Sequence, residues 1–177
     1  LLLLIPGGCD TPVSSPAATG ELLVSELERD TAPMVSEAHQ MTLSEGNNAF
    51  AFDLYAQLAG SEEGNLFFSP LSISTALAMT WVGARNETES QMAETLHYEL
   101  SQEHLHPAFN WLDLTLQSRG EGAEGLDGEP FRLHIANALW GLDGYGFLSD
   151  FLDTLALNYG AGMNLMDFIG DPDGARL

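Results

Sequence analysis

Residues 65–79 read NLFFSPLSISTALAM, a short apolar run that passes directly into a capped helix. Leu66 to Phe68 is too short for a helix and has a polar residue on each side, which predicts a buried strand. Ser69 can accept hydrogen bonds from the free N–H groups of a first helical turn, and Pro70 suits the first helical position, where no N–H is needed. The stretch therefore predicts a strand joined to a core helix that begins at Pro70.

The rest of the chain alternates between helical and strand patterns. Apolar spacing predicts that the helix after Ser69 buries the face that carries Ile73, Leu77, Trp81 and Ala84. Further helices are expected at 47–60, 88–96, 107–118 and 148–159, the second opened by a capping box of Thr88 and Gln91 and the last closed by Gly160. Alternating residues predict strands at 131–139 and 163–168, and Asp171 before Pro172 predicts another helix start. The expected fold class is α+β.

The composition limits the classes of partner. The chain of 177 residues has 26 acidic residues against 5 basic ones, all of them arginine, and its formal net charge is −21. Such a surface repels phosphate and anionic lipid, which argues against a nucleic-acid partner or a polybasic membrane contact. A solvated surface is the ordinary interpretation of this charge, and a site for cations or basic proteins is the alternative. The 45% hydrophobic content suffices for one core, as expected for one domain or part of one.

The first residues are typical of an export signal. An apolar run at 1–5 is followed by Pro6, two glycines and Cys9, the single cysteine of the chain. We interpret residues 1–8 as the remnant of a signal peptide. Small residues before a lone cysteine also resemble a bacterial lipobox, so lipidation of Cys9 is expected, with a plain secretory signal as the alternative. Residues 9–46, rich in Thr, Pro, Ser, Ala and Glu, are predicted to be a disordered tether, and residues 47–177 the folded part. An extracellular or periplasmic location follows.

From about Asn47 to Leu177 the sequence resembles the serpins, the serine protease inhibitor superfamily. The resemblance rests on an ordered series of short motifs: NLFFSP at 65–70, GA at 83–84 with Thr88 and Gln91-Met92, ANALW at 136–140, FL at 147–148 and at 151–152, YGA at 159–161, DF at 167–168, and DP at 171–172 with AR at 175–176. Each motif alone is weak, whereas their order and spacing together are specific.

The resemblance implies the N-terminal half of a fold with one large sheet, smaller sheets and surrounding helices. It also implies a mechanism in which a protease cleaves an exposed loop, which then inserts into the sheet and traps the enzyme. The hinge and the loop are expected to follow this sequence. The implied partner is a serine protease, or less often a cysteine protease, and a non-inhibitory binding or structural module is the alternative. By resemblance, Ser69, Ser72 and Asn137 belong to the shutter region that holds the central sheet closed.

No enzyme or cofactor motif stands beside this resemblance. The sequence contains no Gly-x-Ser-x-Gly elbow, no phosphate-binding glycine loop and no His-Glu-x-x-His helix, so we expect neither catalysis nor a cofactor. Two weaker metal hypotheses are disfavoured: a zinc site from His97, His104 and His106 with His39 or His134, and a calcium loop from Asp167, Asp171 and Asp173. Helix ends, a strand end and a helix cap explain these residues more simply.

Overall fold

The computed structural model describes residues 21–61, 64–119, 122, 124–126, 128 and 135–175. In chain order its elements are β1 (Leu22–Leu23), α1 (Glu37–Ser61), α2 (Pro70–Trp81), α3 (Asn86–Leu96), α4 (Gln102–Ser118), β2 (Leu139–Leu142), α5 (Ser149–Tyr159) and β3 (Met163–Met166). Helices and a small sheet therefore occur in one chain. The predicted α+β class is confirmed.

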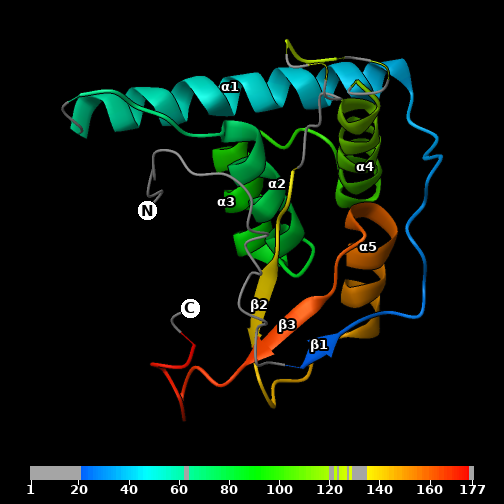
Figure 1. Ribbon diagram of the computed structural model, residues 1–177, viewed down its shortest axis with the longest axis vertical. Helices are drawn as coiled ribbons and strands as arrows, with labels where there is room; N and C mark the ends of the chain where they lie inside the picture. Colours follow the sequence, from blue (N-terminus) through cyan, green and yellow to red (C-terminus); the bar gives the residue numbers. More distant parts are fainter. Residues whose placement is uncertain are drawn as a thin grey trace.

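The strands form one sheet in the order β1-β3-β2. β2 and β3 are parallel and in register from Leu139 opposite Met163 to Leu142 opposite Met166. A parallel pair needs a crossover connection, and α5 supplies it. β1 pairs antiparallel with the other edge of β3, although more than a hundred residues separate the two strands in the sequence. Figure 1 shows this sheet at one end of the molecule, with α5 beside it.

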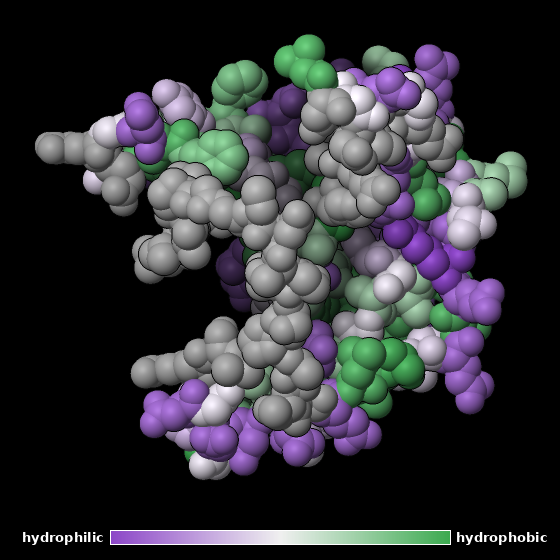
Figure 2. Space-filling view, viewed as in Figure 1, coloured by the Kyte–Doolittle hydropathy of each residue, from purple (hydrophilic) through white to green (hydrophobic). Residues whose placement is uncertain are grey.

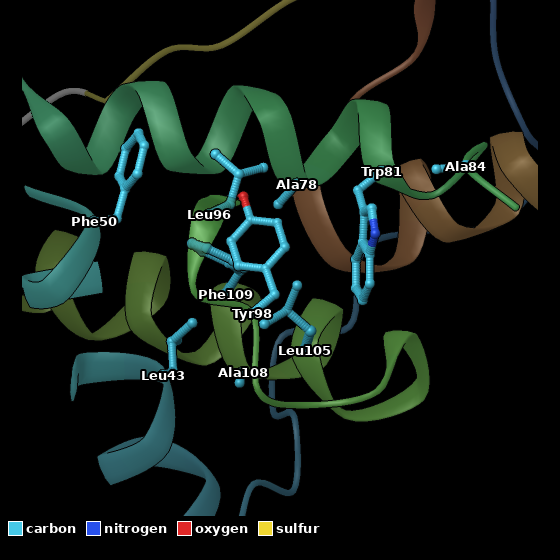
Figure 3. Close-up of a cluster of buried hydrophobic side chains, with 10 residues drawn as sticks. All are labelled: Leu43, Phe50, Ala78, Trp81, Ala84, Leu96, Tyr98, Leu105, Ala108 and Phe109. Carbon is cyan, nitrogen blue, oxygen red and sulfur yellow. The ribbon is translucent and has the colours of Figure 1, made fainter. Parts of the chain in front are cut away.

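The helices pack around a main core next to this sheet. α1 is the longest helix and runs across α2 and α4, while α5 packs against α4 (Figure 1). The shared core consists of ten buried residues, shown in Figure 3: Leu43, Phe50, Ala78, Trp81, Ala84, Leu96, Tyr98, Leu105, Ala108 and Phe109. Two smaller clusters join it to the sheet, one around Met79, Val82 and Leu155 and one around Leu152, Met163 and Leu165.

The predicted buried strand at Leu66–Phe68 is wrong in the structure. Residues 65–69 have no regular secondary structure, and the Phe67 side chain is 88% exposed. A strand exists only through hydrogen bonds to a neighbouring strand, and none of the described residues pairs with this segment. The helix that follows does begin at Pro70 as predicted. Of its predicted buried face, Trp81 and Ala84 are buried as predicted, whereas Ile73 is 37% exposed. Ser74 and Ala78, which were not predicted, are fully buried beside them.

The predicted tether is also wrong for part of its length. α1 begins at Glu37, ten residues before the predicted start at Asn47, and Leu22–Leu23 forms β1. The helix extends into the predicted tether because Leu43 is buried in the main core and Gly46 is buried against α3. Helices in proteins are stabilised mainly by such tertiary packing, which the weak apolar periodicity of 37–46 does not reveal. The predicted signal residues 1–8 and Cys9 lie outside the described residues.

The starts of other helices and strands differ by a few residues from the predicted ones. α3 begins at Asn86, so Thr88 lies inside it and the predicted capping box is wrong. α4 begins at Gln102 and contains Pro107, the predicted start.

β2 begins at Leu139, where the predicted strand 131–139 ends. Residues 135–138 are not a strand, and residues 131–134 lie outside the described residues. α5 and its left-handed end at Gly160 are as predicted.

The surface is strongly polar around the turns after β2 and β3. Figure 2 shows hydrophilic residues gathered along the lower edge of the molecule, where these turns lie in Figure 1. Among the described residues, no helix is both long and apolar enough to cross a membrane.

Candidate functional site

Two serine side chains that contact each other close the N-terminus of α2. Ser69 has an extended backbone, and its Oγ accepts a hydrogen bond from the backbone N–H of Ser72 at 3.3 Å. The two Oγ atoms lie 2.9 Å apart. The predicted helix cap at Ser69 is confirmed, and the structure brings two of the three predicted shutter residues together.

Asn137 lies at a cavity beside a different part of α2. It lies half-buried in the segment before β2, and it lines a cavity of about 50 Å³ together with Leu71 and Thr75. Its side chain makes no hydrogen bond to another described residue, and because the residue is only half-buried, the rule that buried polar groups are hydrogen-bonded does not apply to it. Neither Ser69 nor Ser72 lines this cavity. The shutter role of the three residues therefore stays a prediction.

The cavity itself has a mixed lining. Its polar residues are Arg29, Thr75, Asp113, Asn137 and Tyr159, and its apolar residues are Leu71, Met79, Phe109, Leu112, Leu116 and Ile135. Ligand pockets have volumes of roughly 300–1,000 Å³, whereas a cavity of this size suits a few water molecules. We therefore do not assign it as a substrate site.

Three polar side chains form a hydrogen-bonded cluster next to this cavity, and the sequence analysis does not predict it: Arg29, Asn110 and Asp113. The Arg29 guanidinium donates from Nε to Oδ1 of Asn110 at 2.8 Å and from Nη2 to Oδ2 of Asp113 at 2.6 Å. Asn110 is fully buried, and its Nδ2 donates to the backbone carbonyl of Asp30 at 2.7 Å. Arg29 and Asn110 are 81 positions apart in sequence, so only the folded chain reveals the pair. The available signal was a polar Asn110 next to the apolar Phe109 in a helical pattern.

A second buried polar contact joins α2 to the segment after α3. The Tyr98 hydroxyl donates to the backbone carbonyl of Ser74 at 2.6 Å. Figure 3 shows this hydroxyl pointing toward the helix that carries Ala78 and Trp81. Burial raises the pKa of Tyr98, although its hydrogen bond with Ser74 acts in the opposite direction. The phenol therefore stays neutral and serves as a donor.

A third buried contact pairs a histidine with a tyrosine. Nδ1 of His106 lies 2.7 Å from the Tyr159 hydroxyl, while Nε2 is buried without a partner among the described residues. Burial lowers the pKa of His106 from 6.5 to about 4 and raises that of Tyr159, to which the nearby Tyr98 also contributes. Both groups are neutral at physiological pH. The pair is suited to packing between α4 and α5 rather than to proton transfer at a surface.

The histidines of the zinc hypothesis are not brought together. Nε2 of His97 lies 2.8 Å from Oδ2 of Asp53. The His104 ring packs on the His39 ring, with the two centroids 4.4 Å apart. His106 is buried and contacts Tyr159. His134 lies outside the described residues. Within the described part of the chain, no group of three or more His, Cys, Asp or Glu side chains is placed to hold a metal ion.

The aspartates of the calcium hypothesis cap local turns. Oδ1 of Asp167 accepts from the backbone N–H of Gly170 at 2.6 Å, and Oδ1 of Asp171 accepts from that of Gly174 at 3.0 Å. The carbonyl of Asp171 also accepts from the N–H of Ala175 at 3.1 Å. This is the cap predicted at Asp171, although residues 172–175 form a turn in the structure.

Comparison with known proteins identifies the family. The family model described as "Serpin (serine protease inhibitor)" matches residues 45–177, which is most of the chain. The chain belongs to the serpin family. The short motifs that first indicated the serpins, from the junction at Ser69 to the turn at Asp171, all lie within the matched residues.

Individual serpins agree with this assignment. An uncharacterized serpin-like protein of Thermococcus kodakarensis is 33% identical over 97% of this chain and 40% of its own length. The leukocyte elastase inhibitors of Xenopus laevis and Bos taurus are 36% and 38% identical over 76% of this chain, and 34% and 33% of their own lengths. The chain thus spans two-fifths or less of the length of these relatives.

Solved serpin structures share the fold. Cleaved kallistatin in complex with heparin superposes with a TM-score of 0.60 at 31% identity, covering 75% of this chain and 38% of that one. Cleaved Serpin 42Da superposes with a TM-score of 0.63 at 26% identity, covering 77% of this chain and 34% of that one. The helices and the small mixed sheet described above are therefore part of a serpin fold.

Proposed function

We propose that the protein containing this chain inhibits serine proteases by cleavage and insertion of a reactive loop. The observation that carries the proposal is the serpin match over residues 45–177. Relatives that are 36–38% identical over 76% of the chain are named leukocyte elastase inhibitors, which supports protease inhibition as the activity.

The geometry of the sheet is compatible with this mechanism. β2 lies at the edge of the described sheet, and its pairing with β3 leaves its other side open to further strands. Loop insertion enlarges a sheet by one strand, so a sheet that grows from β2 is suited to it. The contact between Ser69 and Ser72 fixes the start of α2. We infer that these two serines, with Asn137, help to hold the complete sheet closed before insertion.

The test uses the full-length protein that contains this chain. It should be incubated with serine proteases of trypsin, chymotrypsin and subtilisin type, and with a papain-type cysteine protease. The expected result is stoichiometric loss of activity of at least one enzyme, together with a complex that survives SDS. Cleavage of the protein without loss of protease activity would instead assign it to the non-inhibitory serpins.

We also propose that the protein is exported and anchored through lipid on Cys9. The proposal is supported by the apolar run that precedes this single cysteine. Each buried CH₂ of an acyl chain contributes about 0.8 kcal/mol, so a multiply acylated cysteine would hold the protein on a membrane. Mass spectrometry of the membrane fraction should detect diacylglyceryl-cysteine as the mature N-terminus, and Cys9→Ser should release soluble protein. A mature N-terminus at another residue would contradict the lipid anchor.

A further inference from the structure

The N-terminal residues 21–30, here called the strap, contact three elements of the serpin fold. Their first anchor is the outer edge of β3, where Leu22 pairs with Asn164 and Leu23 with Met163. The backbone N–H of Leu165 donates to the carbonyl of Glu21 at 2.7 Å. The Leu23 side chain packs on the third core cluster. Edge strands expose unpaired backbone groups, and the strap covers those of β3.

At this first anchor, the backbone of the strap passes very close to Gly162. A Cβ added to Gly162 would lie 2.7 Å from the carbonyl oxygen of Leu23 and 2.8 Å from the Val24 side chain. Real Cβ atoms do not approach a backbone oxygen so closely, so this contact requires glycine. The glycine at position 162 therefore leaves room for an extended segment to lie along the edge of β3.

The second anchor is the charged cluster on α4. Arg29 donates to both Asn110 and Asp113, and the fully buried Asn110 donates to the carbonyl of Asp30 at 2.7 Å. The N–H of Asp30 donates to the carbonyl of Leu157 on α5 at 3.0 Å. Hydrogen bonds between charged groups are about twice as strong as neutral ones. The buried Asn110 side chain makes its shorter hydrogen bonds to Arg29 and Asp30. Asn110 therefore recognises these two residues of the strap.

The strap is held less firmly between its two anchors. Glu26, Leu27 and Glu28 are exposed, and the Leu27 side chain is 46% exposed. In this middle part the Ser25 hydroxyl donates to Oδ1 of Asp153 at 2.5 Å. A segment with little buried apolar area between two anchors can open as a unit while the rest of the fold stays closed.

We propose that the outer edge of β3, together with Asn110 and Asp113 on α4, is a peptide-binding site, and that residues 21–30 occupy it as a releasable strap. The site takes an extended segment in which an apolar residue pairs with β3 and an arginine follows six positions later, as Leu23 and Arg29 do. The serpin family model matches from residue 45, whereas the alignment with the serpin-like protein of Thermococcus kodakarensis covers 97% of this chain and so includes the strap. The proposal does not depend on protease inhibition.

Hydrogen exchange on the full-length protein tests the release of the strap. The amide of Leu165 faces the strap, whereas the amide of Asp143 donates to Met166 at 2.9 Å on the β2 side. In the double variant Leu23→Ser/Arg29→Ala, exchange at Leu165 should rise about tenfold or more, because both anchors are lost, while exchange at Asp143 is unchanged. Arg119→Ala, which removes an exposed arginine at the end of α4, is the matched control and should change neither amide. Equal acceleration at Leu165 and Asp143 would mean that the whole sheet has loosened, and it would overturn the proposal.

Binding of a labelled peptide with the sequence of residues 21–30 tests the site itself. The peptide should bind the Leu23→Ser/Arg29→Ala protein, whose site is intact but vacated, and should bind wild-type protein at least about tenfold more weakly because the strap competes in cis. Adding Asp113→Asn to the double variant, or replacing the arginine of the peptide by alanine, should abolish binding. Absence of binding to the double variant, or equal binding to all of these proteins, would overturn the proposal.

Discussion

The Tyr159 hydroxyl lies 2.7 Å from Nδ1 of His106, and this contact joins α5 to α4 inside the serpin core. The rings meet edge to face at a centroid distance of 5.8 Å, and the Trp81 ring packs on the same imidazole at 5.8 Å. Nε2 is buried and has no partner among the described residues, so the surroundings of the imidazole favour its neutral form.

The first prediction is a loss of stability in acid that depends on His106. Its pKa is about 4 in the folded protein and 6.5 when solvated, so the unfolded state binds more protons between these values. The contribution of this group to the free energy of unfolding should therefore be complete above pH 6.5 and fall as the pH drops toward 4, by roughly 3 kcal/mol in total. Urea unfolding between pH 7 and pH 4 should show this fall in wild type and a much smaller one in His106→Gln. Parallel curves for the two proteins would contradict it.

The second prediction concerns the Tyr98 hydroxyl. Tyr98→Phe removes the 2.6 Å hydrogen bond to the carbonyl of Ser74 and leaves that buried carbonyl without this donor. The free energy of unfolding should fall by about 1–1.5 kcal/mol, which denaturant titration can resolve. Tyr145→Phe is the control, because Tyr145 is 66% exposed and should change stability by less than about 0.5 kcal/mol.

The third prediction compares two glycines of the same helix. A Cβ at Gly46 would collide with the carbonyl oxygen of His97, whose backbone is held in the left-handed conformation at the end of α3. Gly46→Ala should therefore destabilise the protein by about 1–3 kcal/mol through overpacking. At Gly60 nothing lies within 4 Å of the added Cβ, so Gly60→Ala should stabilise it by up to about 1 kcal/mol. Thermal melting of both variants should show shifts of opposite sign.

The sequence predicted those elements whose signals are local. The cap at Ser69, the proline at the first position of α2 and the left-handed end of α5 at Gly160 each follow from the chemistry of one or two residues, and each is present. The family was also predicted, because its motifs are short contiguous stretches.

The remaining features depend on contacts between distant residues. The first turns of α1 are stabilised by burial of Leu43 and Gly46 against other helices, which a pattern of 37–46 alone does not encode. The Phe67 side chain is exposed because no described strand covers its segment. The strap depends on the pairing of Arg29 with Asn110 and Asp113 on α4, which the tether-like composition of residues 9–46 does not reveal.

The last prediction is that Ser69→Ala weakens the start of α2 in the full-length protein. Loss of the N-cap bond to Ser72 should cost about 0.5–2 kcal/mol of unfolding free energy. Ser101→Ala is a matched control, since Ser101 occupies the same position before α4 but makes no side-chain cap bond, and its loss should cost less.

A shutter role for Ser69 predicts a further effect beyond this loss of a cap. If the Ser69–Ser72 contact helps to keep the complete serpin sheet closed, Ser69→Ala should allow intermolecular strand insertion on mild heating. Native gels after incubation near the onset of melting should then show a ladder of oligomers for Ser69→Ala and none for Ser101→Ala. Unfolding of Ser69→Ala without a ladder would reduce the role of Ser69 to that of a helix cap, because an N-cap alone changes the stability of a helix and has no reason to open a sheet.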